Sequence, residues 1–194
     1  MSTVILENKT WTPEEYFEIE KYSEEKHEFY FGNLIIMPGE SRIANKINRN
    51  FVRALEKGVN PDLFEIYNHD VRLVVRKNEI YRYPDIVVAP DTDDIDEYVV
   101  KSPVIMVEVA SEKSWRTDTG AKRREYSALP SLKYYLIVSQ EETFVELCIR
   151  KGSDWTFVHF EELDETIELS DFNLKITLSE IYHRVKFADS KTDS

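Results

Sequence analysis

The chain has 194 residues, of which 42% are hydrophobic and 32% are charged, and its formal net charge is −12. This length and composition are typical of a globular domain with its own hydrophobic core. No stretch approaches the roughly 18 apolar residues that a membrane-spanning helix needs, and no signal peptide is visible at the N-terminus. A single cysteine, Cys148, excludes an internal disulfide and favours a reducing compartment, so we expect a cytoplasmic protein.

Local patterns predict both helices and strands. Thr12 and Glu15 can form a capping box around Pro13, which marks the start of a helix. Gly32-Asn33 lies between two apolar runs and favours a β-hairpin. A second helix is indicated by apolar residues at every fourth position: Ile43, Ile47, Phe51 and Leu55. In chain order, the expected helices are 12–22, 41–57, 115–128 and 178–185, and the expected strands are 27–31, 34–37, 64–67, 71–75, 80–83, 86–88, 104–109, 132–138, 144–149 and 155–160.

The order strand, helix, strand between Val104 and Val138 predicts one parallel crossover in a largely antiparallel sheet. The fold class that we expect is α/β, with a mixed β-sheet flanked by helices and preceded by an N-terminal helix and hairpin. We expect one domain over residues 1–186, followed by a polar tail over residues 187–194.

Charge is spread unevenly along the chain. Residues 42–57 carry five basic residues against one acid, and residues 113–124 again carry five against one. The net charge of −12 works against a protein that binds phosphates over its whole surface. The two basic stretches could still form a local positive surface, or each could be a solvated helix face.

Two carboxylates interrupt strands that should be buried. Glu108 is the only charged residue in the apolar run 103–110, and Asp85 follows Pro84 between strand-forming residues. A buried carboxylate costs several kcal/mol unless a cation or a donor compensates it. If the two strands are neighbours, both carboxylates can reach one Mg²⁺, which prefers oxygen ligands. In the alternative interpretation, Asp85 caps a turn and Glu108 forms a structural salt bridge with Lys122 or Arg116.

Asp118 and Lys122 are four residues apart on the expected third helix and therefore share a face. They form either an exposed ion pair worth a few tenths of a kcal/mol, or a pair beside the metal site in which Lys122 acts on a water or a phosphate. We expect Cys148 to be a buried small hydrophobe. The histidines show no metal-type spacing, and we interpret them as structural or surface residues: His27, His69, His159 and His183.

Pro84-Asp85 followed by Glu108-Val109-Ala110 resembles the motif of the PD-(D/E)XK nuclease superfamily, except that Ala110 occupies the place of the lysine. The chain resembles the Uma-type restriction endonuclease family more closely, from Trp11 to Val185. The resemblance rests on residues 107–111, Asp118, Lys122, Tyr126 and residues 130–138. In that family the lysine is placed on the following helix, here Lys122, and the first acid matches Glu28. Family members often carry a histidine before the second helix, where this chain has Ala44.

The resemblance implies a restriction-endonuclease-like fold and a Mg²⁺-dependent endonuclease that hydrolyses DNA phosphodiester bonds, with Mn²⁺ as a substitute metal. Asp85 and Glu108 would hold the ion, with Glu28 as a further ligand. Lys122 would orient the attacking water or stabilise the transition state, and Asp118 would position Lys122. Cleavage of both strands would favour a homodimer. Basic residues that could touch backbone phosphates are Arg49, Arg53, Lys113 and Arg116.

Two other functions are compatible with the same sequence. The protein could keep the fold without turnover and serve as a nucleic-acid or protein-interaction module. It could also be a metal-dependent hydrolase of small phosphorylated molecules, for which an acidic chain needs no extended basic surface.

Overall fold

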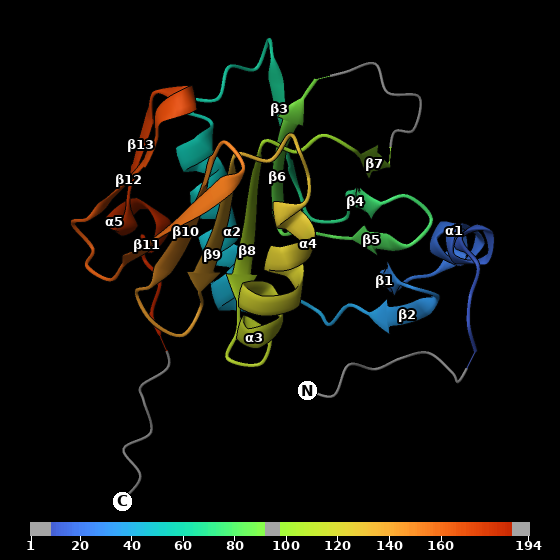
Figure 1. Ribbon diagram of the computed structural model, residues 1–194. Coiled ribbons are helices and arrows are strands. Elements are labelled where there is room, and N and C mark those ends of the chain that lie inside the picture. The colour runs from blue at the N-terminus through green and yellow to red at the C-terminus, as the bar shows by residue number, and fades with distance from the viewer. Residues whose placement is uncertain (1–8, 92–97, 188–194) are drawn as a thin grey trace, which may run out of the picture.

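The computed structural model describes residues 9–91 and 98–187 and is built around a six-stranded mixed sheet with helices on both faces (Figure 1). From one edge to the other, its strands are β11 (Asp154–Phe160), β10 (Val145–Lys151), β9 (Tyr134–Ser139), β8 (Ile105–Ala110), β6 (Ile86–Pro90) and β3 (Phe64–Asn68). Strands β8 and β9 are parallel, and the other neighbours are antiparallel. The expected crossover and the α/β class are therefore confirmed.

The two faces of this sheet are covered by different helices. Helix α2 (Arg42–Leu55) packs on one face, where Ile47 and Phe51 join Val107 in one buried cluster. The opposite face carries a helical run of three parts, α3 (Trp115–Thr117), a π-helical turn (Asp118–Lys122) and α4 (Arg123–Ser127). Tyr126 of this run packs against Met106 in a second cluster. Because side chains alternate along a strand, Glu108 points to the same face as Met106, toward α4.

A second sheet lies beside the first, where the sequence predicts only one. Its strands, in order, are β2 (Asn33–Ile36), β1 (His27–Tyr30), β5 (Ile80–Arg82), β4 (Arg72–Arg76) and β7 (Val99–Val100). Helix α1 (Pro13–Tyr22) begins with the expected capping box at Thr12 and covers this sheet through Tyr16. The chain passes from β5 to β6 through residues 83–85, which belong to neither sheet. Pro84 has no N–H for a ladder, so the chain leaves one sheet there before it enters the other.

The C-terminal part adds a small hairpin that the sequence analysis missed. Strands β12 (Thr166–Leu169) and β13 (Leu174–Thr177) are joined by a 3-10 turn (Ser170–Phe172), and α5 (Leu178–Ile181) follows. Ile167, Ile176 and Ile181 join the cluster around α2, so this hairpin extends the core on that face. Both strands do alternate, with Ile167, Leu169, Leu174 and Ile176 buried, but each has only four residues, the shortest run in which alternation indicates a strand. Helix α5 ends at Ile181, four residues earlier than expected.

Two further local expectations need correction. The first hairpin turns at Phe31 and Gly32, which have φ angles of 45° and 81°, and not at Gly32-Asn33. This type of turn favours glycine at its second central position, which fixes Gly32 there and forces Phe31 into the first. The helix expected over 115–128 is interrupted by the π-helical turn.

Cys148 is buried as expected, and burial raises the pKa of its thiol to about 12. Across 9–91 and 98–187, no helix has the length and apolarity that a membrane span requires.

Arg150 of β10 connects the main sheet to the end of α4. Its guanidinium donates hydrogen bonds to the carbonyls of Leu132, Ser127 and Leu129, at 2.6, 2.9 and 2.7 Å, and lies 4.4 Å from the ring centre of Trp155.

We expect Arg150→Met to lower the free energy of unfolding by about 2–3 kcal/mol, because the aliphatic stem stays while three carbonyls lose a charged donor. Urea unfolding followed by circular dichroism measures the change. Arg124→Met, at an exposed position on α4, is the matched control and should change stability by less than about 0.5 kcal/mol. Equal stability of the two variants would contradict this role for Arg150.

Candidate functional site

Asp85 and Glu108 come together because β6 and β8 are neighbouring antiparallel strands. Ile86 pairs with Val107, which places Asp85 opposite the position of Glu108. The Asp85 Oδ2 atom also accepts a hydrogen bond of 2.6 Å from the Val109 amide. The expected neighbouring strands are therefore β6 and β8, with Asp85 directly before β6 and Glu108 on β8.

The site residues that the sequence analysis singled out all line one pocket. This pocket has a volume of about 240 Å³ and opens between the end of β8, the start of α2 and the segment after β2. The predicted residues in its lining are Glu28, Asp85, Glu108, Asp118 and Lys122. Ala44 lines the same pocket. The five predicted residues come from four separate parts of the chain and meet at one place.

Lys122 lies among three of these carboxylates. Its Nζ is 3.1 Å from Glu108 Oε1, 3.4 Å from Asp118 Oδ1 and 3.5 Å from Glu28 Oε1. The Lys122 side chain is only 12% exposed and that of Asp118 only 3%. The exposed ion pair proposed as one alternative is therefore wrong. The π-helical turn runs from Asp118 to Lys122, and such turns occur frequently at functional sites.

The protonation of Glu108 is strongly affected by this environment. Burial, together with the nearby acids Asp118 and Asp85, raises its pKa to about 8 against the opposing effect of Lys122. The Tyr126 hydroxyl donates a hydrogen bond of 2.9 Å to Glu108 Oε1. Burial likewise raises the pKa of Asp85 to about 6. A cation placed beside these carboxylates would stabilise their charged forms.

Glu28 has a different environment, because two cations hold it. Its Oε2 accepts a hydrogen bond of 2.7 Å from Arg82, and Lys122 lies beside its Oε1. Burial alone would raise its pKa, but Lys122 and Arg82 outweigh burial and hold the pKa below its usual value. Arg82 is fixed in turn by Glu125 of α4, at 2.9 Å. Sequence reasoning missed Arg82 and Glu125, since they lie on separate elements with no motif to join them.

Sequence reasoning interpreted His69 as a structural or surface residue and did not consider Glu40. In the part of the chain that the structure describes, one set of three potential metal ligands has its donor atoms within 4.8 Å of one another: Glu40, His69 and Asp85. Glu40 precedes α2 and lines the pocket, and His69 follows β3. Only the pairing of β3 with β6 brings His69 beside Asp85, and no sequence spacing shows that pairing.

A comparison with protein-family models covers most of the chain. Residues 13–179 match the model of the Uma2 family, described as "Putative restriction endonuclease". The chain belongs to this family. The resemblance expected from the sequence motifs is thereby confirmed.

Two Synechocystis proteins are similar to this member of the Uma2 family. The uncharacterized protein slr1290 is 29% identical over 182 residues, which cover 91% of this chain and 93% of the relative. The uncharacterized protein sll1609 is 31% identical over 140 residues, which cover 71% of this chain and 79% of the relative. A crystal structure from Anabaena variabilis, described as "a putative nuclease belonging to DUF820", matches with a TM-score of 0.71 at 15% identity. It covers 88% of this chain and 97% of its own, and it supports the fold assignment.

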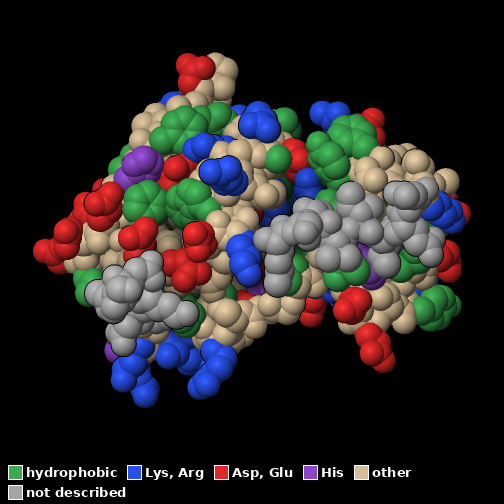
Figure 2. Space-filling view, turned by 90° about the horizontal axis from the view of Figure 1, so that it is seen from below, with side chains coloured by type: hydrophobic (Ala, Val, Ile, Leu, Met, Phe, Trp, Pro, Cys, Tyr) green, Lys and Arg blue, Asp and Glu red, His purple; other side chains and the backbone are tan. Residues whose placement is uncertain are grey.

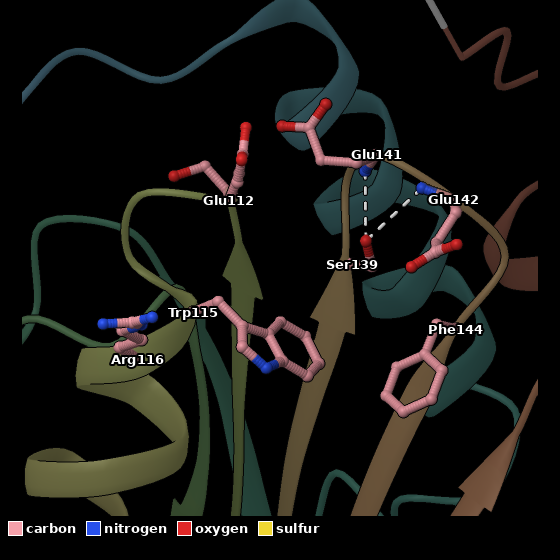
Figure 3. A pocket seen from close by; sticks show the side chains of 8 residues that line it. Glu112, Trp115, Arg116, Ser139, Glu141, Glu142 and Phe144 are labelled. Atoms are coloured by element: carbon pink, nitrogen blue, oxygen red, sulfur yellow. Dashed lines mark hydrogen bonds between the residues drawn. The ribbon is translucent and has the colours of Figure 1, made fainter. Parts of the chain in front are cut away.

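A second pocket of about 580 Å³ adjoins the first and shares Ser111 with it. Trp115 and Phe144 face one another edge-on at its base, with ring centres 5.4 Å apart (Figure 3). Three acids and one base complete the rim: Glu112, Glu141, Glu142 and Arg116. The surface on this side of the site is therefore acidic and aromatic.

The raised pKa of Glu108 predicts how stability depends on pH in metal-free protein. A carboxyl with a higher pKa in the folded state stabilises the fold below its unfolded pKa, and this contribution is lost as the pH rises through the folded pKa. The wild type should therefore lose stability relative to Glu108→Gln between about pH 4.5 and pH 8. Urea unfolding in EDTA across this range measures the difference, and Glu24→Gln, at an exposed position, is the control. A pH-independent difference for Glu108→Gln would contradict the assigned environment.

Proposed function

We propose that this Uma2-family protein is a metal-dependent endonuclease that hydrolyses DNA phosphodiester bonds. The observation that carries the proposal is that Asp85, Glu108 and Lys122 line one pocket; the salt bridge between Glu108 and Lys122 alone would also fit a structural role. Two carboxylates and a lysine are the groups that metal-assisted phosphodiester hydrolysis uses. The chain supplies the lysine from the helix after β8, although Ala110 replaces it on the strand.

The donor set fits a divalent cation. Asp85 and Glu108 offer carboxylate oxygens, and burial keeps the pKa of each above its usual value, so that a bound cation would relieve an unfavourable charge. An ion held by these two residues would polarise a phosphoryl oxygen and lower the pKa of the attacking water. Glu28 remains a proposed further ligand, with its two oxygens facing Arg82 and Lys122.

Lys122 contributes as a charged donor and not as a base. Its carboxylate neighbours raise its pKa well above the ordinary value despite burial, so it keeps its proton at neutral pH. Its ammonium group can donate to a water or to a phosphate oxygen on which negative charge develops. Asp118 and Glu28 hold the ammonium in place from two sides.

A nucleic-acid chain would approach the pocket along the start of α2. Arg42, Lys46 and Arg49 line a surface hollow that shares Glu40 and Ser41 with the site pocket. On the face of the molecule that Figure 2 draws, Lys and Arg side chains gather at the lower edge, whereas Asp and Glu side chains gather along the left side. The separation of charge supports phosphate contacts on one side of the site and none along the acidic pocket.

The acidic pocket also favours a second candidate function. Glu112, Glu141 and Glu142 would repel an extended polyanion that passes Ser111 (Figure 3). A small phosphorylated substrate could occupy the 240 Å³ pocket without crossing these acids. The same metal and lysine chemistry would then act on a small molecule.

We expect wild-type protein to relax and linearise supercoiled plasmid in Mg²⁺ or Mn²⁺ and to be inactive in EDTA. Glu108→Gln and Lys122→Met should each lower the cleavage rate at least about 100-fold, because each removes charge stabilisation at the reacting phosphate. Glu24→Gln should cut like the wild type. Cleavage that persists in EDTA would contradict the proposal, and turnover of a small phosphodiester without plasmid cleavage would favour the second candidate.

Phosphate contacts along α2 make a prediction for binding. Arg49→Gln should weaken DNA binding for all sequences alike and should reduce the slope of log K against log salt by about 1. Fluorescence anisotropy with a labelled duplex at several salt concentrations measures both values. Lys175→Gln, at an exposed position on β13, removes the same charge elsewhere and should leave the slope unchanged. Equal slopes for Arg49→Gln and the wild type would exclude this approach of the nucleic acid.

A further inference from the structure

We propose that Glu40 and His69 join Asp85 in a divalent-metal site that prefers Mn²⁺, Co²⁺ or Zn²⁺ to Mg²⁺. The site shares Asp85 with the proposed nuclease centre. The inference depends only on ion binding by the protein and not on DNA cleavage. Neither residue was expected to bind metal from the sequence. The inference rests on how the three side chains are brought together and held.

The geometry of the three groups suits a single ion. One carboxylate oxygen of Glu40, one of Asp85 and one imidazole nitrogen of His69 all lie within 4.8 Å of one another. His69 Nε2 is 3.7 Å from Glu40 Oε1. Ligand bonds of roughly 2.1 Å place two ligands of one ion about 3–4 Å apart, so small side-chain rotations complete the site.

The backbone fixes His69 next to Asp85. Strand β3 pairs with β6 up to Asn68 and Ile86, and the His69 amide then donates a hydrogen bond of 3.0 Å to the Asp85 carbonyl. His69 has a φ angle of 52°, which turns the chain at the end of β3. Histidine is among the residues that adopt this left-handed conformation more readily than most. The separation of the two residues is therefore set by main-chain bonds.

Glu40 and Asp85 are oriented by neighbours that leave room for an ion. The side-chain amides of Asn45 and Asn48 donate to the two oxygens of Glu40. Asp85 receives its single hydrogen bond within the described residues at Oδ2, from Val109. Its Oδ1 is thus available as a ligand. Hydrogen bonds to ligating groups orient them and tune metal affinity, and these amides take that role here.

The ligand types decide which metal is preferred. Mg²⁺ prefers carboxylate and water oxygens and rarely uses imidazole, whereas Mn²⁺, Co²⁺ and Zn²⁺ accept nitrogen as well. The position is also separate from the ion-pair contacts of Lys122. In the described part of the chain, the ion-pair contacts of Lys122 go to Glu28, Glu108 and Asp118, and Asp85 is not among them. The Asp85 carboxylate therefore makes no direct ion pair with the Lys122 ammonium, although the charge of Lys122 acts to lower the Asp85 pKa.

The test is direct metal binding to the full chain after EDTA treatment, measured by calorimetry with Mn²⁺ and Mg²⁺ separately. We expect Mn²⁺ to bind the wild type more tightly than Mg²⁺. His69→Gly and Glu40→Gln should each weaken Mn²⁺ binding at least about tenfold. Glycine tolerates the positive φ at position 69, so the turn should survive. His183→Ala, at an exposed position outside the cluster, is the matched control and should bind like the wild type.

A measurement on the wild type does not depend on how the variants fold. Substoichiometric Mn²⁺ should broaden the imidazole NMR signals of His69 before those of His27, His159 and His183. Unchanged Mn²⁺ affinity in both variants, or broadening that spares His69, would overturn the site. Metal binding through His69 without plasmid cleavage would support this inference and contradict the proposed function. Metal-dependent cleavage with normal Mn²⁺ affinity in His69→Gly would support the proposed function and contradict this metal site.

Discussion

The site depends on the ion pairs of Lys122, whose ammonium group lies within 3.5 Å of three buried carboxylates. Each of these acids would be costly to bury alone. Together with Arg82, which holds the far oxygen of Glu28, the lysine supplies the positive charge that allows them to meet. The compensation is incomplete, as the raised pKa values of Glu108 and Asp85 show. A partly compensated cluster of acids is what a bound cation would complete.

The fold serves this arrangement through the join between its two sheets. Residues 83–85 leave the smaller sheet and enter the larger one, so Asp85 stands where both sheets and the start of α2 meet. Glu28 reaches the pocket from the smaller sheet, and Glu108 reaches it from the larger one. The helical run after β8 then places Lys122 between them. A one-residue shift of β8 would turn Glu108 to the face covered by α2 and remove it from the site.

The surroundings of the pocket divide its surface by charge. The start of α2 presents Arg42 and Arg49, while the pocket on the other side carries Glu112, Glu141 and Glu142. An overall charge of −12 hides this local difference. Association with a polyanion depends on the local field more than on the net charge, so the proposed nucleic-acid binding would use the basic side. Under the proposed nuclease function, the acidic side would limit how far a long substrate could extend.

The sequence determined the parts of this protein that depend on local patterns. The capping box at Thr12, the apolar stripe of α2 and the crossover from β8 to β9 were all readable, as were the two acids that stand out in apolar strands. Tertiary structure decided the rest. The division into two sheets, the turn at Phe31 and the π-helical turn at Asp118–Lys122 depend on which strands pair and on contacts between distant segments. Arg82, Glu40 and His69 escaped prediction for the same reason, since long-range pairing leaves no spacing in the sequence by which such neighbours can be recognised.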